Sequence, residues 1–420
     1  MVAQGVSGQS RRLTLAAALS GLVAVLVLSS CVKAAPPPEP VTIRFVCPDV
    51  ELDHYRQMAE QFKQDHSWIT VELIPRSWDM LGGLDPEEAD AFVSSQFALN
   101  WMRDGGQLLN LSPFIEQDSA FQADDLYPGL LGLYTADGKA WGIPAGVDAL
   151  VMYYNRDMFD QYGVAYPQAG WTWEEFLYTA AALRDEAGEA FGYAADVSGM
   201  FEPIVFVYQH GGRIFDDLQN PTRTTFDDPL TIEGLEWYLG LMYEYNVAPT
   251  PEQVRDVLGG NLQAGVLAGK VGMWTGMLSD RGGSTWPAQW NMDWAIVSLP
   301  RDRQAATLTL VQGYFVMAQT AYPDACWQWI SFLSRQLPDR AAPARRSLAE
   351  SREYSNRVGE DVAQVARDSM EGALLLSPEL AEFEDALNVF GNAMSRILAG
   401  AATVEEGLVW AQQQSEQENP

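Results

Sequence analysis

The most constraining feature of this sequence is a strand, a helix and a second strand that follow one another over residues 41–74. Residues 41–46 (VTIRFV) and 69–74 (ITVELI) alternate between apolar and polar side chains and are rich in β-branched residues, so both are predicted strands. Residues 53–65 between them place apolar side chains at helical spacing. Because a helix that joins two neighbouring strands in this way makes them parallel, with a right-handed crossover, the pattern predicts an α/β fold.

Helix-start signals then recur along the chain. Capping boxes at residues 172–175 (TWEE) and 403–406 (TVEE) predict helices that begin there. Residues 228–229 (DP) predict another, since an acidic cap followed by proline suits a first helical turn. Residues 322–323 (YP) and 377–378 (SP) predict two more. The C-terminal portion of the chain is therefore expected to be helical.

Two further strands are predicted at residues 89–97 and 149–154. Residues 141–146 (WGIPAG) contain glycine and proline and are predicted to be a turn before the second of these strands. A helix over residues 156–161 should end at Gly163, because glycine suits the left-handed position there. Residues 41 to about 412 are too many for one ordinary core and favour two lobes.

The first 30 residues are typical of an exported protein. Arg11 and Arg12 precede an uncharged apolar run over residues 13–28, which is shorter than the roughly 20 residues of a membrane-spanning helix. A basic start followed by a short apolar run predicts a secretory signal peptide over residues 1–30. A single membrane-spanning anchor is the alternative.

The segment around Cys31 indicates how the mature chain would be held. Residues 28–31 (LSSC) resemble a bacterial lipobox, so cleavage before Cys31 and lipidation of Cys31 are expected. Residues 31–40 are rich in proline and favour extended conformations, so they are predicted to be a tether. The lipid would then be the only contact with the membrane.

Composition excludes some partners. The formal net charge is −30, and we find no basic stripe, so nucleic-acid binding is not expected. The 14 tryptophans and 16 tyrosines are a large supply of aromatic side chains, part for the core and part for stacking on a ligand. Besides Cys31 there are only Cys47 and Cys326, and the histidines are scattered, so we predict neither metal site nor cofactor. Buried free thiols are favoured, and a disulfide between Cys47 and Cys326 is the alternative.

Residues 134–176 carry an ordered set of more specific motifs. These are YTADGKAWGIP at 134–144, Asp148, YYNRDMF at 153–159, YGV at 162–164 and WTWEEF at 171–176. The set resembles the family 1 extracellular solute-binding proteins, which are sugar-binding proteins of ABC importers. Supporting motifs follow in the order of that family, at residues 211–216 (a turn between hairpin strands), 268–274 (a strand entrance), 313–318, 325–333 and 343–347.

The resemblance implies an α/β fold: a two-lobed clamp like the type II periplasmic binding proteins, in which each lobe is a mixed sheet flanked by helices, with a helical C-terminal portion. Lobe one would comprise residues 41–147 and 296–340, and lobe two residues 148–295 and 341–420. The implied function is that of an extracytoplasmic monomer, not an enzyme, which captures a sugar or oligosaccharide between its lobes and delivers it to the transmembrane subunits of an ABC permease.

A sugar site needs aromatic rings against C–H faces and planar polar groups for paired hydroxyls. The resemblance places Asp148 before a crossing strand and Trp274 at a stacking position. Asp49 follows the first predicted strand, and Asp90 is assigned to the end of the third, since ligands of open α/β sheets bind beyond the carboxyl ends of strands. Further candidates are three aromatic residues and one glycine where backbone could approach a ligand: Trp101, Phe201, Tyr208 and Gly313.

One segment departs from the family, and two other functions stay open. Residues 76–104 are short for the family, so the rim that lobe one gives to the pocket is expected to differ. A secreted glycoside hydrolase with a carboxylate pair is one alternative, although we find no nucleophile or metal motif for it. A ligand sensor without a transport role is the other, and the sequence does not separate it from a transporter.

Overall fold

A computed structural model describes residues 39–77, 88–185, 187–195 and 201–418 of the chain. The predicted signal peptide, Cys31 and most of the predicted tether lie outside the described residues, as does part of the short segment 76–104.

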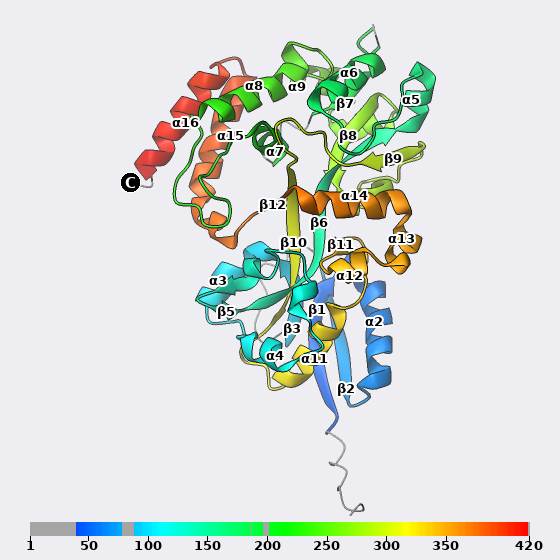
Figure 1. Cartoon of the computed structure of the whole chain (residues 1–420), viewed down its shortest axis with the longest axis vertical. Coiled ribbons are helices and arrows are strands. Elements are labelled where there is room, and N and C mark those ends of the chain that lie inside the picture. The colour runs from blue at the N-terminus through cyan, green and yellow to red at the C-terminus, as the bar shows by residue number, and fades with distance from the viewer. Residues whose placement is uncertain (1–38, 78–87, 186, 196–200, 419–420) are drawn as a thin grey trace, which may run out of the picture. The chain divides into compact units, whose positions relative to one another are not determined.

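The described residues contain one 10-stranded sheet, in which the principal strands have the order β2-β1-β3-β10-β6-β8-β7 (Figure 1). Strands β9 and β11 pair with β6, β12 pairs with β10, and β4 and β5 form a separate two-stranded sheet. The strands are β1 (Val41–Pro48), β2 (Ile69–Arg76), β3 (Ala91–Ser95), β4 (Thr135–Ala136), β5 (Lys139–Ala140), β6 (Gly142–Asn155), β7 (Phe191–Ala194), β8 (Val271–Met277), β9 (Trp294–Val297), β10 (Thr307–Val316), β11 (Ala342–Pro343) and β12 (Ala373–Leu375).

The first βαβ unit is confirmed. Strands β1 and β2 are parallel and in register from the pair Val41 and Ile69 onward, and α2 (Leu52–Asp65) joins them. The buried face of α2 carries Tyr55, Met58 and Phe62, at the helical spacing that the sequence indicates. Strand β3 is parallel to β1 and antiparallel to β10, so the sheet is mixed, as expected.

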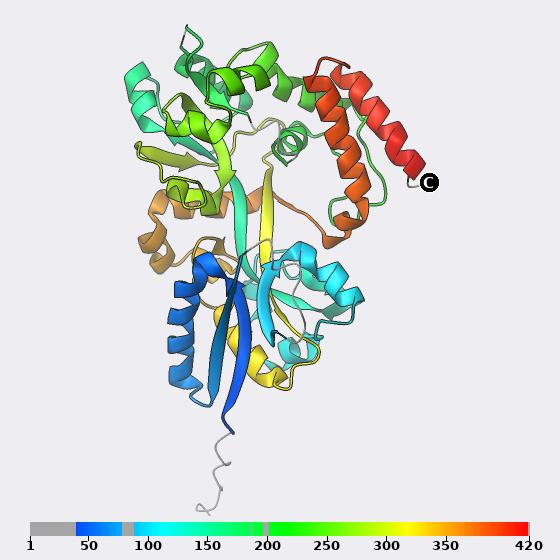
Figure 2. The same ribbon diagram turned by 180° about the vertical axis from the view of Figure 1, so that it is seen from behind.

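Strand β6 connects the two halves of the sheet (Figures 1 and 2). Its first part pairs with β10, as far as Ala149, and its second part pairs with β8 and β9 from Leu150 onward. The turn predicted at residues 141–146 is therefore wrong, because the strand already begins at Gly142.

The reason is that glycine and proline serve the sheet itself at this place. Pro144 lies where the pairing with β10 shifts register between Gln312 and Gly313, and such irregularities accommodate a residue without an N–H group. Gly146 faces the segment before β11 so closely that a Cβ there would lie 2.9 Å from the Cβ of Ala341.

The helical predictions are largely confirmed. Gly163 ends α5 with a φ of 66°, and the capping boxes at residues 172–175 and 403–406 have both reciprocal hydrogen bonds. The helices are α2, α3 (Leu99–Asp104), α4 (Ser112–Gln117), α5 (Arg156–Tyr162), α6 (Trp173–Leu183), α7 (Phe201–His210), α8 (Pro229–Tyr243), α9 (Pro251–Asp256), α10 (Leu262–Leu267), α11 (Pro323–Leu333), α12 (Arg346–Ala349), α13 (Arg352–Val358), α14 (Glu360–Glu371), α15 (Glu384–Leu398) and α16 (Val404–Glu418).

Two local predictions need correction. The segment after 377–378 opens with a 3-10 helix, η7 (Pro378–Phe383), and the α-helix begins only at Glu384. The expected hairpin around residues 211–216 is reduced, among the described residues, to an isolated bridge between Phe215 and Thr224.

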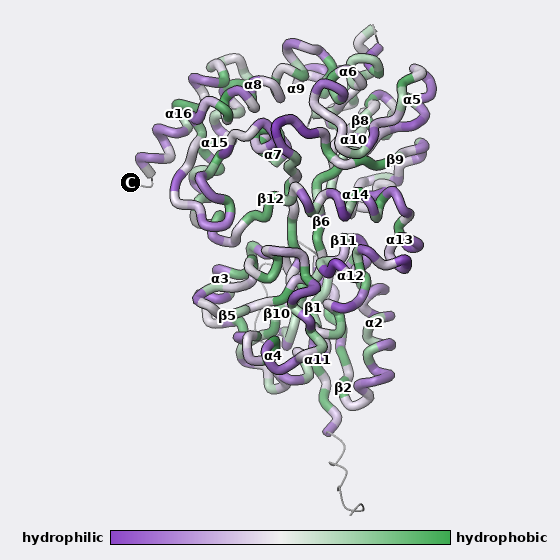
Figure 3. The backbone as a smooth tube through the Cα atoms, in the orientation of Figure 1, coloured by the Kyte–Doolittle hydropathy of each residue, from purple (hydrophilic) through white to green (hydrophobic). Residues whose placement is uncertain are grey.

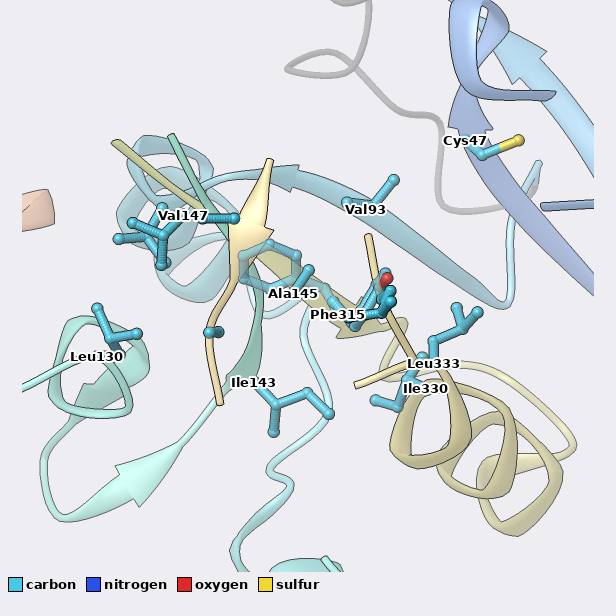
Figure 4. Packing of buried hydrophobic residues seen from close by; sticks show 14 of the residues in the cluster. Cys47, Val93, Leu130, Ile143, Ala145, Val147, Phe315, Ile330 and Leu333 are labelled. Atoms are coloured by element: carbon cyan, nitrogen blue, oxygen red, sulfur yellow. The ribbon is translucent and has the colours of Figure 1, made fainter. Parts of the chain in front are cut away.

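The core lies along both faces of the sheet. Figure 4 shows Ile143, Ala145 and Val147 of β6 near Phe315 of β10, with Ile330 and Leu333 of α11 beyond. A second cluster of buried residues fills the half that contains β7, α6, α8, α15 and α16. Figure 3 shows that the central strands are mainly hydrophobic, whereas α13 and α14 are mainly hydrophilic.

Both cysteines of the folded part are buried free thiols, as favoured. Burial is the main cause that raises the pKa of Cys47 and of Cys326 to about 12, so each stays protonated at neutral pH.

Candidate ligand-binding site

A pocket of about 740 Å³ opens beside β8, where the ends of β7 and β8 meet the start of α7. The segment from α9 to α10 closes one side, and leucines of β6 and β10 close another. Its lining combines aromatic rings with charged and amide side chains: Phe201, Trp274, Trp286, Glu202, Asp280, Arg255, Asn261 and Gln263. The volume lies within the range of small-molecule sites in proteins.

The aromatic wall of the pocket is the edge of a larger ring cluster. Trp274 stacks with Tyr153 of β6 at 6.0 Å between centroids and meets Trp290 edge-on at 5.1 Å. Trp286 meets Trp290 edge-on at 5.0 Å. Trp274 is only 3% exposed, whereas Trp286 is half-buried, so Trp286 offers more of its ring to a ligand.

Glu202 is a buried acid in the pocket lining, and it is only 4% exposed. Its carboxylate accepts hydrogen bonds from the hydroxyls of Tyr193 at 2.5 Å and Tyr238 at 2.8 Å, and from Thr275. These hydroxyl donors therefore fix the orientation of the Glu202 carboxylate in the native fold. An ionised carboxylate accepts stronger hydrogen bonds from hydroxyl groups than a neutral oxygen does.

The segment that follows β8 supplies the other acid. It begins as a 3-10 helix, η6 (Leu278–Gly283), which bends at Gly282 with a φ of 68°. The carboxylate of Asp280 accepts hydrogen bonds from the backbone N–H of Met277 at 2.8 Å and from the hydroxyl of Thr285. These contacts hold Asp280 at the pocket and leave Trp286 just beyond the bend.

Asp148 lies behind this segment and does not line the pocket. Its Oδ1 accepts a hydrogen bond from the N–H of Ser279 at 2.9 Å, and its Oδ2 accepts one from the Ser279 hydroxyl at 2.6 Å. Burial raises the pKa of Asp148 to about 6, an effect that the two Ser279 hydrogen bonds partly oppose.

Of the other predicted ligand residues, the structure brings Trp274 and Phe201 together at the pocket. Asp49 and Trp101 lie elsewhere on the surface, and Trp101 is 43% exposed. Tyr208 is buried within α7 and is not among the pocket residues.

Two more predicted ligand residues are engaged in the packing of the fold. The carboxylate of Asp90 accepts hydrogen bonds from the N–H and Nε of Arg44 and from the hydroxyl of Thr320. A Cβ on Gly313 would lie 2.4 Å from the ring of Tyr134, so packing of that ring accounts for the glycine.

Sequence reasoning missed most of the polar lining. Glu202 directly follows Phe201, which was predicted, but nothing local distinguishes it from a surface acid. The available signal was the close spacing of Trp286 and Trp290, since two such large rings in the segment that connects β8 to β9 are unusual for a loop. Asn261 and Gln263 carry no such signal.

Neither a cluster of metal-ligating side chains nor a membrane-spanning helix is present among the described residues. Within ranges 39–77, 88–185, 187–195 and 201–418, no three or more His, Cys, Asp or Glu side chains gather so that they could hold a metal ion. In the same part of the chain, no helix has the length and apolarity needed to cross a membrane.

A mixed sheet in which the long strand β6 pairs with strands of both halves is the fold of the two-lobed periplasmic binding proteins. The model of the family described as bacterial extracellular solute-binding protein matches residues 50–336. This chain belongs to that family.

Comparison with solved structures confirms the fold. An ABC substrate-binding protein from Listeria monocytogenes in complex with cycloalternan has a TM-score of 0.73 at 20% identity, covering 90% of this chain and 99% of that chain. The sugar-binding protein MalE from Xanthomonas citri has a TM-score of 0.72 at 18% identity, covering 90% and 97%.

Among sequence relatives, an arabinooligosaccharide-binding protein of Halalkalibacterium halodurans is 30% identical over 193 residues. That match spans 46% of this chain and 40% of the length of the relative. A Brucella abortus protein described as a binding protein is 20% identical over 370 residues, which is 83% of this chain and 85% of that protein. The relatives and the fold are those of binding proteins.

Proposed function

We propose that this chain captures a neutral oligosaccharide in the pocket beside β8 and delivers it to the transmembrane subunits of an ABC importer. The observation that carries the proposal is the pairing of aromatic rings with oriented acids in one pocket. Trp286 and Phe201 offer apolar faces for the C–H side of a sugar ring, and the carboxylates of Glu202 and Asp280 can accept hydrogen bonds from its hydroxyls. No covalent chemistry is needed for this task.

Relatives support the same ligand class. Two sequence relatives are named as arabinooligosaccharide-binding proteins, and structures with this fold hold cycloalternan or maltotetraose. The charges of the pocket favour a neutral ligand, because Arg255 is the one basic side chain among the described residues that line it, against the acids Glu202 and Asp280.

A panel of ligands in a thermal-shift assay tests the proposal. A ligand that binds only the folded chain at 100 times its Kd should stabilise it by about 2.7 kcal/mol, which raises the melting temperature by several degrees. We expect neutral arabino- or gluco-oligosaccharides to give this shift and uronic-acid oligosaccharides to give none. If no carbohydrate shifts the melting temperature but a peptide or polyamine does, the sugar proposal fails.

The same incubations separate binding from hydrolysis. A glycoside hydrolase would release new reducing ends from the oligosaccharides, and a binding protein leaves their number unchanged. Release of reducing ends that disappears in the Glu202→Gln variant would contradict the proposed function. Transport is separated from sensing by uptake of labelled ligand in cells with and without the importer.

We propose further that the chain is exported and is attached to the membrane through a lipid on Cys31. We also propose that the chain passes from one lobe to the other after residues 147, 295 and 340. Replacing Cys31 with serine removes the thiol that would carry the lipid, so the variant is expected to leave the membrane fraction, while Cys47→Ser should stay there. Fractionation of cells that express each variant measures this. A Cys31→Ser chain that remains membrane-bound would show that the apolar run at residues 13–28 is itself the anchor.

A further inference from the structure

Asp148 sits at the point where β6 changes partners. It is opposite Leu310 of β10, and two residues later Leu150 is opposite Met277 of β8. Its side chain is therefore carried by a strand that pairs with both halves of the sheet, immediately before β6 begins to pair with the strand that lines the pocket.

Both oxygens of the Asp148 carboxylate accept hydrogen bonds from the same residue, Ser279. Ser279 donates its backbone N–H to Oδ1 at 2.9 Å and its hydroxyl to Oδ2 at 2.6 Å. Two charged residues that act on Asp148, Asp280 and Arg281, directly follow Ser279 on the same segment, and they shift the pKa of Asp148 in opposite directions. Glu51, which follows β1, is a further acid that interacts electrostatically with Asp148.

Ser279 directly precedes the residues of this segment that line the pocket. Asp280, the next residue, lines the pocket, and the Ser279 carbonyl accepts a hydrogen bond from the hydroxyl of Ser284 at 2.6 Å. Trp286 lies two residues further on and lines the pocket as well. Tyr153 of β6 fastens the start of the same segment, because its hydroxyl donates to the carbonyl of Met277 at 2.8 Å.

We infer that Asp148 is a positioning residue, which holds the wall formed by residues 278–286 against β6 through Ser279 and so sets where Asp280 and Trp286 meet the ligand. The inference rests on the proposed function of the pocket. It gives Asp148 a different role from the direct ligand contact expected from the sequence. Since β6 pairs with both halves of the sheet, the position of residues 278–286 is set by β6 and not by the outer helices.

The pattern of hydrogen bonds gives a discriminating set of variants. In Asp148→Asn, the amide oxygen can accept from the Ser279 N–H and the amide nitrogen can donate to the Ser279 hydroxyl, so the contact survives without charge. In Asp148→Ala both hydrogen bonds are lost. We expect ligand affinity within about 3-fold of wild type for Asp148→Asn and a loss of about 10-fold or more for Asp148→Ala.

A double-mutant cycle with Ser279→Ala identifies the partner through which Asp148 acts. If the carboxylate works through Ser279, adding Ser279→Ala to Asp148→Ala costs no further affinity, because the hydroxyl has already lost its acceptor. If instead Asp148→Asn is as damaging as Asp148→Ala, and the effects of Asp148→Ala and Ser279→Ala simply add, the carboxylate acts on the ligand directly and the inference is wrong.

Amide hydrogen exchange in the ligand-free chain keeps this test separate from the proposed function. Asp148→Ala should speed exchange over residues 278–286, beginning at the Ser279 N–H, whereas Asp148→Asn should not, and α16 serves as an internal reference. Unchanged exchange over residues 278–286 in Asp148→Ala overturns the inference whatever the affinity does. Faster exchange there in a chain that binds no carbohydrate would uphold the positioning role and reject the sugar ligand. Should Asp148→Ala not fold, Ser279→Ala gives the same exchange comparison.

Discussion

Replacing Glu51 with glutamine is expected to stabilise the folded chain by about 3 kcal/mol at pH 8 and by under about 1 kcal/mol at pH 5. Glu51 ends a short 3-10 helix, η1 (Asp49–Glu51), after β1 and is only 6% exposed. Burial, and next the nearby acid Asp339, raise its pKa from 4.5 to about 7, while Arg340 opposes the effect. The ionised form that prevails at pH 8 is thus held in surroundings that disfavour it.

The direction of the pH dependence follows from proton binding. A carboxyl whose pKa is higher in the folded chain than in the unfolded chain binds protons more tightly when folded, so the free energy of unfolding falls as the pH rises from about 4.5 to 7. Above pH 7 the loss is complete. Glutamine has nearly the same shape and does not ionise, so the Glu51→Gln variant should escape this part of the pH dependence.

Urea unfolding of wild type and variant from pH 5 to pH 8 measures the effect. The matched control is Glu60→Gln, which changes an exposed acid on α2 and should shift stability by no more than about 0.5 kcal/mol at any of these pH values. If the free energies of unfolding of Glu51→Gln and wild type run parallel over this range, the pKa of Glu51 is not raised in the folded chain and the prediction is wrong.

The elements that could be predicted from the sequence are those whose signals are local. The capping box at Thr172 and Glu175, and the proline after Asp228, act within one helical turn, and the helices α6 and α8 begin where these signals indicate. The alternation in β1 and β2 likewise reflects burial on a pleated sheet.

Predictions that depended on distant partners were less reliable. Asp90 was predicted to lie at the end of a strand, where ligands bind, but it directly precedes β3, and its carboxylate accepts a hydrogen bond from Thr320, 230 residues away. Gly146 was predicted to be in a turn and Gly313 to let the backbone approach a ligand, whereas close packing against Ala341 and Tyr134 accounts for these two glycines. Because such contacts form only when the chain closes on itself, neither composition nor spacing near these residues could indicate them.

The candidate site shows the same limit. Trp274 was predicted on its place in a strand motif and lies at the pocket, but its 3% exposure makes it chiefly a packing residue between Tyr153 and Trp290. The hydroxyls of Tyr193, Tyr238 and Thr275, which come from other elements, orient the carboxylate of Glu202 at the site. The sequence could therefore indicate an aromatic pocket near β8, but not which ring faces the ligand.

Replacing Trp286 with alanine is expected to weaken oligosaccharide binding by about 30-fold or more, which corresponds to about 2 kcal/mol, with little effect on stability. Trp286 is half-buried, lines the pocket and meets the rings of Trp274 and Trp290 at the edge of the ring cluster, so its truncation removes ligand contact more than core packing. Isothermal titration with an oligosaccharide that gives a thermal shift measures the affinity.

A tryptophan of similar burial provides the matched control. Trp410 on α16 is also half-buried and lies against Arg396 at 4.8 Å, far along the chain from the pocket residues, so Trp410→Ala should keep wild-type affinity. Loss of affinity in both variants would point to a general effect of removing a ring. Unchanged affinity in Trp286→Ala would mean that the ligand does not use this pocket wall, and the site would have to be sought elsewhere, beginning with exposed Trp101 on α3.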